Sequence, residues 1–220
     1  MMERIVNNKK ILALLLVSVL TLFLLTGCSG EKDVLKVNGK TFESNEVIGM
    51  IYYFAFNNNV DLKAKDIDVS IVNAITSEAI KVFEKYQLIQ EALKKNEDSP
   101  LDKDWKKKSL ESAKSAMGSW SKKDKEKREK EGVTSKILAY YMGLYAYLQP
   151  AYQTVIAEKE PISQKEINEY YKTNKANYKG KKKADRDTEI AAYLEYTKFE
   201  EAVDKLIAAA KIEEPKSIKL

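Results

Sequence analysis

The chain has 220 residues, 44% hydrophobic and 32% charged, a composition typical of a folded globular protein. Lys and Arg number 38 against 33 Asp and Glu, and the net charge of +5 is too weakly basic to indicate a nucleic-acid-binding domain. Histidine is absent, which excludes imidazole as a general base, zinc ligand or pH switch. Because the chain has one cysteine, it cannot form an intrachain disulfide. Gly and Pro are scarce, with 8 and 4 residues, and this scarcity of turn-forming residues favours long helices over a many-stranded sheet.

Residues 1–27 have the pattern of a bacterial signal peptide. Arg4, Lys9 and Lys10 precede residues 11–25, which contain no charged side chain. A basic segment before a short apolar run is typical of a peptide that directs export. The run has 15 residues, fewer than the roughly 20 that a membrane-spanning helix needs. We therefore expect it to be cleaved off rather than to remain as a transmembrane anchor.

The only cysteine of the chain lies shortly after this run. The sequence Leu25-Thr26-Gly27-Cys28 resembles the bacterial lipobox, in which cleavage precedes a cysteine that carries diacylglycerol. The resemblance implies that Cys28 is lipidated, with acyl chains such as palmitate, and that residues 28–33 form a polar tether. The mature protein is then expected outside the cytoplasm, anchored by lipid to the cell membrane. The alternative is an inert thiol at the end of an uncleaved membrane helix.

Two short β-prone runs, residues 34–37 and 40–42, flank Asn38-Gly39. An Asn-Gly pair between such runs is the strongest local signal for a β-hairpin. Ser44 then predicts the N-cap of a helix that ends at Asn57. Apolar and aromatic residues surround most of the circumference of this helix, so we expect it to be sandwiched between other elements.

Helical spacing of apolar residues and local capping signals predict the remaining helices. Thr134 is expected to N-cap one of them, and Ser163 and Glu166 form a capping box that opens another. Residues 122–131 are ten consecutive charged residues before Gly132, which predicts a solvated helix. The predicted helices span about residues 70–95, 102–119, 121–131, 134–159, 163–178 and 188–210.

The C-terminal part is predicted to return to the hairpin. Residues 179–187 indicate a basic loop, after which Thr188 caps the closing helix. Ile212, shortly before a proline, predicts a terminal strand that could pair with the hairpin. We therefore expect one mainly α domain over residues 34–214, with a small N-terminal β-hairpin that a C-terminal strand could join, and a tail over 215–220.

Three segments of this domain resemble the extracytoplasmic chaperones and foldases of the SurA and PrsA type. Residues 37–42 resemble the strand, Asn-Gly turn and strand that open the family's domain. Residues 86–93, Tyr-Gln-Leu-Ile-Gln-Glu-Ala-Leu, are similar to the end of its long helix. Residues 162–171 followed by Asn174 and Tyr178 resemble the helix that precedes its isomerase module. The resemblance covers most of residues 34–214 and implies a multi-helix chaperone lobe that cradles unfolded clients.

The chain departs from this family at one point. Members with a parvulin-type isomerase carry roughly ninety residues, with characteristic histidines, between the Tyr-Tyr helix and the closing helix. Here residues 179–187 fill that interval, and the chain has no histidine. We therefore expect no prolyl isomerase activity and no other enzymatic activity, because no nucleophile motif, paired carboxylates or phosphate-binding loop is present. No catalytic residue, metal site or cofactor is predicted.

The remaining expectation is a holdase that binds unfolded or newly secreted polypeptides. Tyrosine suits such contacts because it offers a large apolar surface with a polar end and few rotamers. The candidates are surplus helical tyrosines, although an aromatic stripe on a helix more often belongs to a core. The residues expected to contact clients are Tyr52, Tyr53, Tyr140, Tyr145 and Tyr147.

Two other functions remain open from the sequence. The same helical lobe could serve a structural or adaptor lipoprotein that binds one folded envelope partner. A small-ligand-binding lipoprotein is less favoured, because a two-lobed α/β binding protein needs alternating strands and helices. No nucleic-acid partner is predicted, and the sequence leaves the client and the oligomeric state open.

Overall fold

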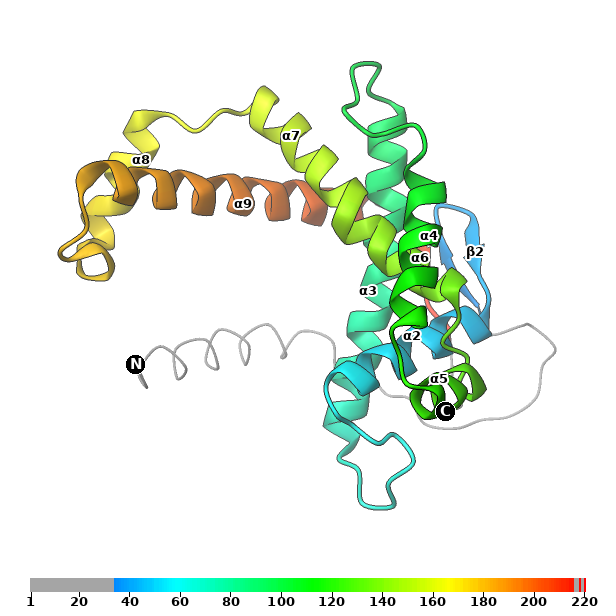
Figure 1. The fold of residues 1–220 in the computed structure, drawn as a ribbon. Helices are drawn as coiled ribbons and strands as arrows, with labels where there is room; N and C mark the ends of the chain where they lie inside the picture. The colour runs from blue at the N-terminus through cyan, green and yellow to red at the C-terminus, as the bar shows by residue number, and fades with distance from the viewer. Residues whose placement is uncertain (1–33, 216–217, 219) are drawn as a thin grey trace. The chain divides into compact units, whose positions relative to one another are not determined.

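Helices form most of the chain in the computed structural model, which describes residues 34–215, 218 and 220 (Figure 1). The predicted mainly α class with a small antiparallel sheet near the N-terminal end is confirmed. The predicted signal peptide and the tether that begins at Cys28 lie outside the described residues.

The sheet has three short strands. β1 (Leu35–Val37) and β2 (Lys40–Phe42) form the predicted hairpin. Asn38 and Gly39 between them have φ angles of 49° and 80°, the left-handed values of a tight turn whose twist matches the strands. β3 (Ile212–Glu213) pairs antiparallel with the other edge of β1, so the order is β2-β1-β3. The predicted C-terminal strand is confirmed.

The next two helices start with carboxylates. α2 (Ser44–Asn57) is N-capped by Glu43 rather than by Ser44, because Glu43 has the extended backbone of a cap and its N–H donates to the Glu46 carboxylate at 2.9 Å. Ser44 is instead the first helical residue. α3 (Val69–Lys94) begins after Asp68, whose carboxylate accepts a hydrogen bond from the N–H of Ser70 at 2.8 Å. The helix predicted over about residues 70–95 is thus confirmed to within one residue at each end.

Two polar helices follow. α4 (Trp105–Gly118) buries four residues along one side, Trp105, Ser109, Ala113 and Met117, which recur every fourth position. α5 (Lys122–Lys130) buries none, as predicted for a solvated helix. The Ser121 hydroxyl accepts a hydrogen bond from the N–H of Asp124 at 3.1 Å and so caps α5.

The helix predicted from Thr134 exists but is not regular throughout. α6 (Ser135–Gly143) is capped by the Thr134 hydroxyl, and α7 (Gln149–Lys159) continues it. Between them lies η1 (Leu144–Leu148), a stretch of π-helix. A π-helical insertion rotates the residues after it relative to those before it, so the buried faces of α6 and α7 need not coincide.

The two C-terminal helices differ from the prediction at the end of the first and at the start of the second. α8 (Gln164–Thr173) has the predicted capping box at Ser163 but ends before Tyr178, which lies in the 3₁₀ turn η2 (Lys175–Tyr178). α9 (Lys183–Ala209) begins at Lys183 instead of at Thr188, so only residues 179–182 connect it to η2.

The hydrophobic core lies around α3. This helix contacts α2, α6, η1, α7, α9 and β1, and its buried Phe83 and Ile89 belong to the main cluster. The two halves of α9 bury different residues. Phe199 and Val203 join the main cluster, whereas Ile190 packs with residues of α8 and η2 in a separate one.

Candidate functional site

Two of the five candidate tyrosines belong to the core. Tyr52 is only 7% exposed and packs with Leu138. Tyr140 is half-buried, and its ring centroid lies 5.3 Å from that of Phe83 and 5.0 Å from that of Tyr86. Its hydroxyl donates to the Glu46 carboxylate at 3.2 Å. The Tyr52 ring therefore serves packing, whereas Tyr140 both packs on the core and lines the pocket described below.

Tyr53 and Tyr145 belong to a chain of aromatic rings that reaches the surface. The Tyr53 centroid lies 5.2 Å from that of Tyr141, and Tyr141 lies 4.6 Å from Tyr145. Phe54 contacts the same Tyr141 ring edge-on, at 5.9 Å. Tyr145, in η1, is the most exposed of these rings at 44%. The fifth candidate, Tyr147, is half-buried against the main core cluster.

A further tyrosine, Tyr196 of α9, lies near enough to Tyr145 for its charge to affect the Tyr145 hydroxyl, while its own ring contact is with Phe199 at 6.1 Å. Burial, together with Tyr141, Glu78, Tyr196 and Glu200, raises the pKa of Tyr145 to about 12. Tyr196 is 49% exposed, and burial and the neighbouring Glu200 raise the pKa of its hydroxyl. The tyrosine surface, as we call it, therefore consists of Tyr53, Phe54, Tyr141, Tyr145 and Tyr196.

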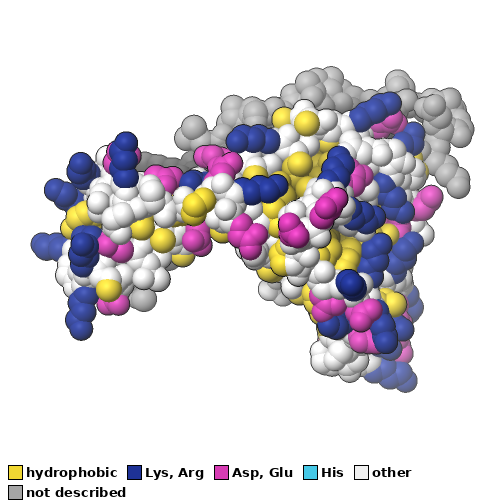
Figure 2. All heavy atoms as spheres, turned by 90° about the horizontal axis from the view of Figure 1, so that it is seen from above, with side chains coloured by type: hydrophobic (Ala, Val, Ile, Leu, Met, Phe, Trp, Pro, Cys, Tyr) yellow, Lys and Arg dark blue, Asp and Glu magenta, His cyan; other side chains and the backbone are white. Residues whose placement is uncertain are grey.

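Charged residues of both signs border this surface. The Lys85 ammonium forms an ion pair with Glu200 at 3.2 Å, and Lys81 pairs with Glu78 at 3.1 Å. Figure 2 shows hydrophobic side chains among charges of both signs, with Lys and Arg at both ends of the view. Adaptable polar edges beside exposed rings are suited to polypeptide contacts that do not read one sequence.

The exposed tyrosines of α9 were not among the residues predicted to contact clients. Tyr193 and Tyr196 are 50% and 49% exposed and lie three residues apart, on one face of the helix. Both follow the helical spacing of the buried residues of α9, because Tyr193 lies three residues after Ile190 and Tyr196 lies seven before Val203. The sequence therefore held no signal for their exposure, which required the fold.

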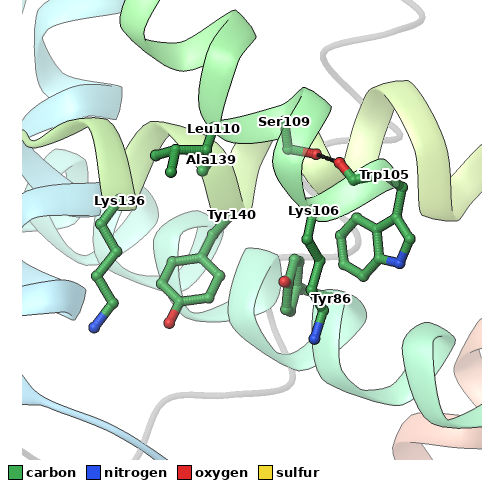
Figure 3. A pocket seen from close by; sticks show the side chains of 8 residues that line it. All are labelled: Tyr86, Trp105, Lys106, Ser109, Leu110, Lys136, Ala139 and Tyr140. Atoms are coloured by element: carbon green, nitrogen blue, oxygen red, sulfur yellow. Dashed lines mark hydrogen bonds between the residues drawn. The ribbon is translucent and has the colours of Figure 1, made fainter. Parts of the chain in front are cut away.

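A pocket of about 190 Å³ lies between α3, α4 and α6. Figure 3 shows the rings of Tyr86, Trp105 and Tyr140 in its wall, with Lys106 and Lys136 on either side of Tyr140. The pocket lining is completed by Ser109, Leu110 and Ala139. The Ser109 hydroxyl donates to the Trp105 carbonyl oxygen at 2.7 Å, so it is satisfied within α4 and is not a free nucleophile.

The two lysines that line the pocket, Lys106 and Lys136, have different interaction partners. The Lys136 ammonium pairs with the Glu46 carboxylate at 2.6 Å. Burial works against ionisation of Glu46, but its contacts with Lys136, the Glu43 backbone and Tyr140 outweigh burial and lower its pKa. The Lys106 ammonium lies 5.6 Å from the Trp105 ring centroid. Burial and the positive charges of Lys94 and Lys40 lower the pKa of Lys106.

Among residues 34–215, 218 and 220, no group of three or more His, Cys, Asp or Glu side chains could hold a metal ion. Within the same residues, no helix is long and apolar enough to cross a bilayer. What the geometry offers is binding surface: the tyrosine surface and the aromatic pocket with its lysines.

No family model, no curated protein and no solved structure matches this chain.

Proposed function

We propose that this chain is a membrane-anchored extracytoplasmic chaperone that holds unfolded or newly secreted polypeptides without prolyl isomerase activity. The observation that carries the proposal is the tyrosine surface, in which α2, α6, η1 and α9 bring partly exposed rings together. Rings held by neighbouring rings lose little conformational entropy when a client binds. The lipobox-like Cys28 supports the anchoring and the extracytoplasmic location.

The proposal revises the client contacts. Tyr145 and Tyr53 remain, Tyr141 and Tyr196 join them, and Tyr52 has no accessible ring face to offer. Unfolded segments that carry apolar side chains would bind broadly and weakly, since the surface has rings and mixed charges but no deep pocket of its own.

The test is the aggregation of a chemically unfolded client diluted into buffer with the soluble fragment 29–220, followed by light scattering. We expect suppression at near-stoichiometric ratios with several unrelated clients. The double variant Tyr145→Ser/Tyr196→Ser should require several-fold more protein for the same suppression. Tyr193→Ser is the matched control, because this residue is equally exposed on α9 but its ring packs at a tilt against Tyr170, with centroids 5.0 Å apart.

The second function, an adaptor lipoprotein with one folded partner, predicts a different result. No unrelated client would be protected, whereas a single envelope protein would bind saturably. Absence of suppression across several clients would therefore overturn the chaperone proposal and favour the adaptor. Equal losses in Tyr193→Ser and in the double variant would remove the tyrosine surface as the binding place.

A further inference from the structure

The pocket between α3, α4 and α6 has the size of one ring. A cavity of roughly 150 Å³ lined by apolar side chains can hold a benzene molecule, and this pocket has about 190 Å³. Its aromatic wall is formed by Tyr86, Trp105 and Tyr140, and tilted or edge-on contacts fix their planes. Gly143 leaves room for them, because a Cβ there would lie 3.0 Å from the Trp105 ring.

The positive charge beside this pocket is not compensated. Lys40, Lys94 and Lys106 form no ion pair with any residue in the described part of the chain. Lys106 is also the second residue of α4, whose N-cap is Asp104. Asp102, just before this helix, pairs with Lys108 instead of with Lys106. A bound anion would give Lys106 the partner that neither aspartate provides.

The ring-sized pocket and the unpaired lysines share a border. Figure 3 shows the Lys106 and Lys136 ammonium groups pointing the same way as the Tyr140 hydroxyl. A ligand that seats a ring against Trp105 and Tyr86 would place a neighbouring anionic group within reach of Lys106. Lys136 already pairs with Glu46, so Lys106 is the cation left for the ligand.

We propose that this pocket binds a carboxylate joined closely to one aromatic ring. Two sources offer this chemistry: a free aromatic carboxylic acid, or the C-terminal residue of a polypeptide that ends in an aromatic side chain. The polypeptide source rests on the proposed function and would give the chaperone a preference for chain ends. The free acid does not depend on that function.

Trp105 reports on its own pocket. The chain has 2 tryptophans, so the full-length Trp120→Phe variant leaves Trp105 as the only indole. Its fluorescence is titrated with N-acetyl-phenylalanine, with N-acetyl-phenylalaninamide, and with a short peptide that ends in Phe as the free acid or as the amide. We expect the acid forms to bind at least tenfold more tightly than the amides. Binding of the peptide acid alone identifies the chain end as the source, and comparable binding of the small acid identifies the free acid.

Two variants and one control distinguish the contribution of the Lys106 charge to ligand binding from that of the pocket shape. Lys106→Met keeps the alkyl chain and should reduce the preference for acid over amide at least fivefold, whereas Lys107→Met, one residue further along α4 and outside the pocket lining, should leave it unchanged. Ala139→Leu fills the pocket and should abolish binding of every ligand while circular dichroism stays that of the parent. Equal affinity for acid and amide, or no fluorescence change with any of the four, overturns the proposal. Neither result depends on the aggregation assay.

Discussion

Glu84 is a carboxyl group placed where a charge is costly. Its side chain lies in α3 and is only 7% exposed. Burial, with the nearby charge of Glu214, raises its pKa from 4.5 to about 7, and Lys81 offsets only part of this shift. The folded protein therefore holds a proton on Glu84 at pH values where the unfolded chain has released it.

The pH dependence of stability follows from the direction of this shift. Because the folded pKa is raised, the contribution of Glu84 is fully present below about pH 4.5 and is lost as the pH rises through about 7. In the Glu84→Gln variant the side chain at this position cannot ionise, so the variant does not lose this stability as the pH rises. We expect the variant to exceed the parent in free energy of unfolding by up to about 3 kcal/mol at pH 8, and to differ little near pH 4.

Urea unfolding at a series of pH values measures this difference. Glu111→Gln, at an exposed position of α4, controls for the loss of one negative charge. A constant difference between Glu84→Gln and the parent from pH 4 to pH 8 would contradict the assignment.

At the level of single residues, the sequence predicted some helix caps but not the exposure of individual tyrosines. The caps Thr134 and Ser163 were predicted correctly, because a cap bonds to the backbone three residues on. Exposure of a tyrosine was not predictable in this way. Tyr52 and Tyr145 both lie in aromatic-rich helical segments, yet one is 7% and the other 44% exposed, because distant segments cover only the first.

At the scale of elements, α2 meets the loop after α5 at a contact between two glycines. A Cβ built on Gly49 would lie 2.4 Å from the carbonyl oxygen of Gly132. Gly132 itself has a φ of 84°, a value that residues with a side chain rarely adopt. The approach of α2 to this loop therefore depends on the absence of a side chain at both positions.

Gly49→Ala is expected to destabilise the protein by about 2–4 kcal/mol, since backbone must move to accept the methyl group. Gly118→Ala is the matched control. It ends α4, and no heavy atom lies within 4 Å of the position that a Cβ would take there, so it should be neutral or stabilising by up to about 1 kcal/mol. Thermal unfolding of both variants measures the contrast, and a neutral Gly49→Ala would mean that α2 packs less closely on Gly132.

Element boundaries failed where tertiary contacts replace local signals. Helix α9 starts early, in a stretch of charged residues, because the Arg186 guanidinium lies over the Tyr171 ring of α8, 3.9 Å from its centroid. The chain leaves α8 early because Tyr178 folds back onto it and is buried beside Ile167. The π-helical turn within the helix after Thr134 likewise has no local sequence signal.

At the scale of the whole domain, Asn38 joins segments from both ends of the described chain. Its Oδ1 accepts the N–H of Lys211 at 2.9 Å, and its Nδ2 donates to the Glu91 carboxylate at 2.8 Å. One side chain thus connects the hairpin turn to the residue before β3 and to α3. The Lys36–Glu213 ion pair, at 2.9 Å, joins the same strands.

We expect Asn38→Gly to lower the free energy of unfolding by about 1 kcal/mol, because both side-chain hydrogen bonds are lost while the left-handed backbone stays allowed. Asn38→Ala loses the same bonds and also strains a φ of 49°, which should add about 1 kcal/mol. Chemical denaturation distinguishes the two. A Gly variant as stable as the parent would show that the hydrogen bonds of Asn38 contribute nothing.

The general architecture was thus accessible from the sequence, because helical periodicity and an Asn-Gly turn are local. The electrostatic influence of Tyr196 on Tyr145, and that of Lys40 and Lys94 on Lys106, were not accessible. Each brings together residues from separate elements, and only the packing of α3 against its neighbours determines which of them lie close.

The position of β1 between β2 and β3 has a consequence for the order in which the chain is made. Lys36 and Val37 pair with Glu213 and Ile212, so during synthesis from the N-terminus this edge of β1 stays unpaired until residue 213 has emerged. An unpaired strand edge is a template for pairing with other chains. Translation that stops before Ile212 would leave a hairpin and most helices but no sheet closure, and such a shortened product is the form we would expect to associate with itself.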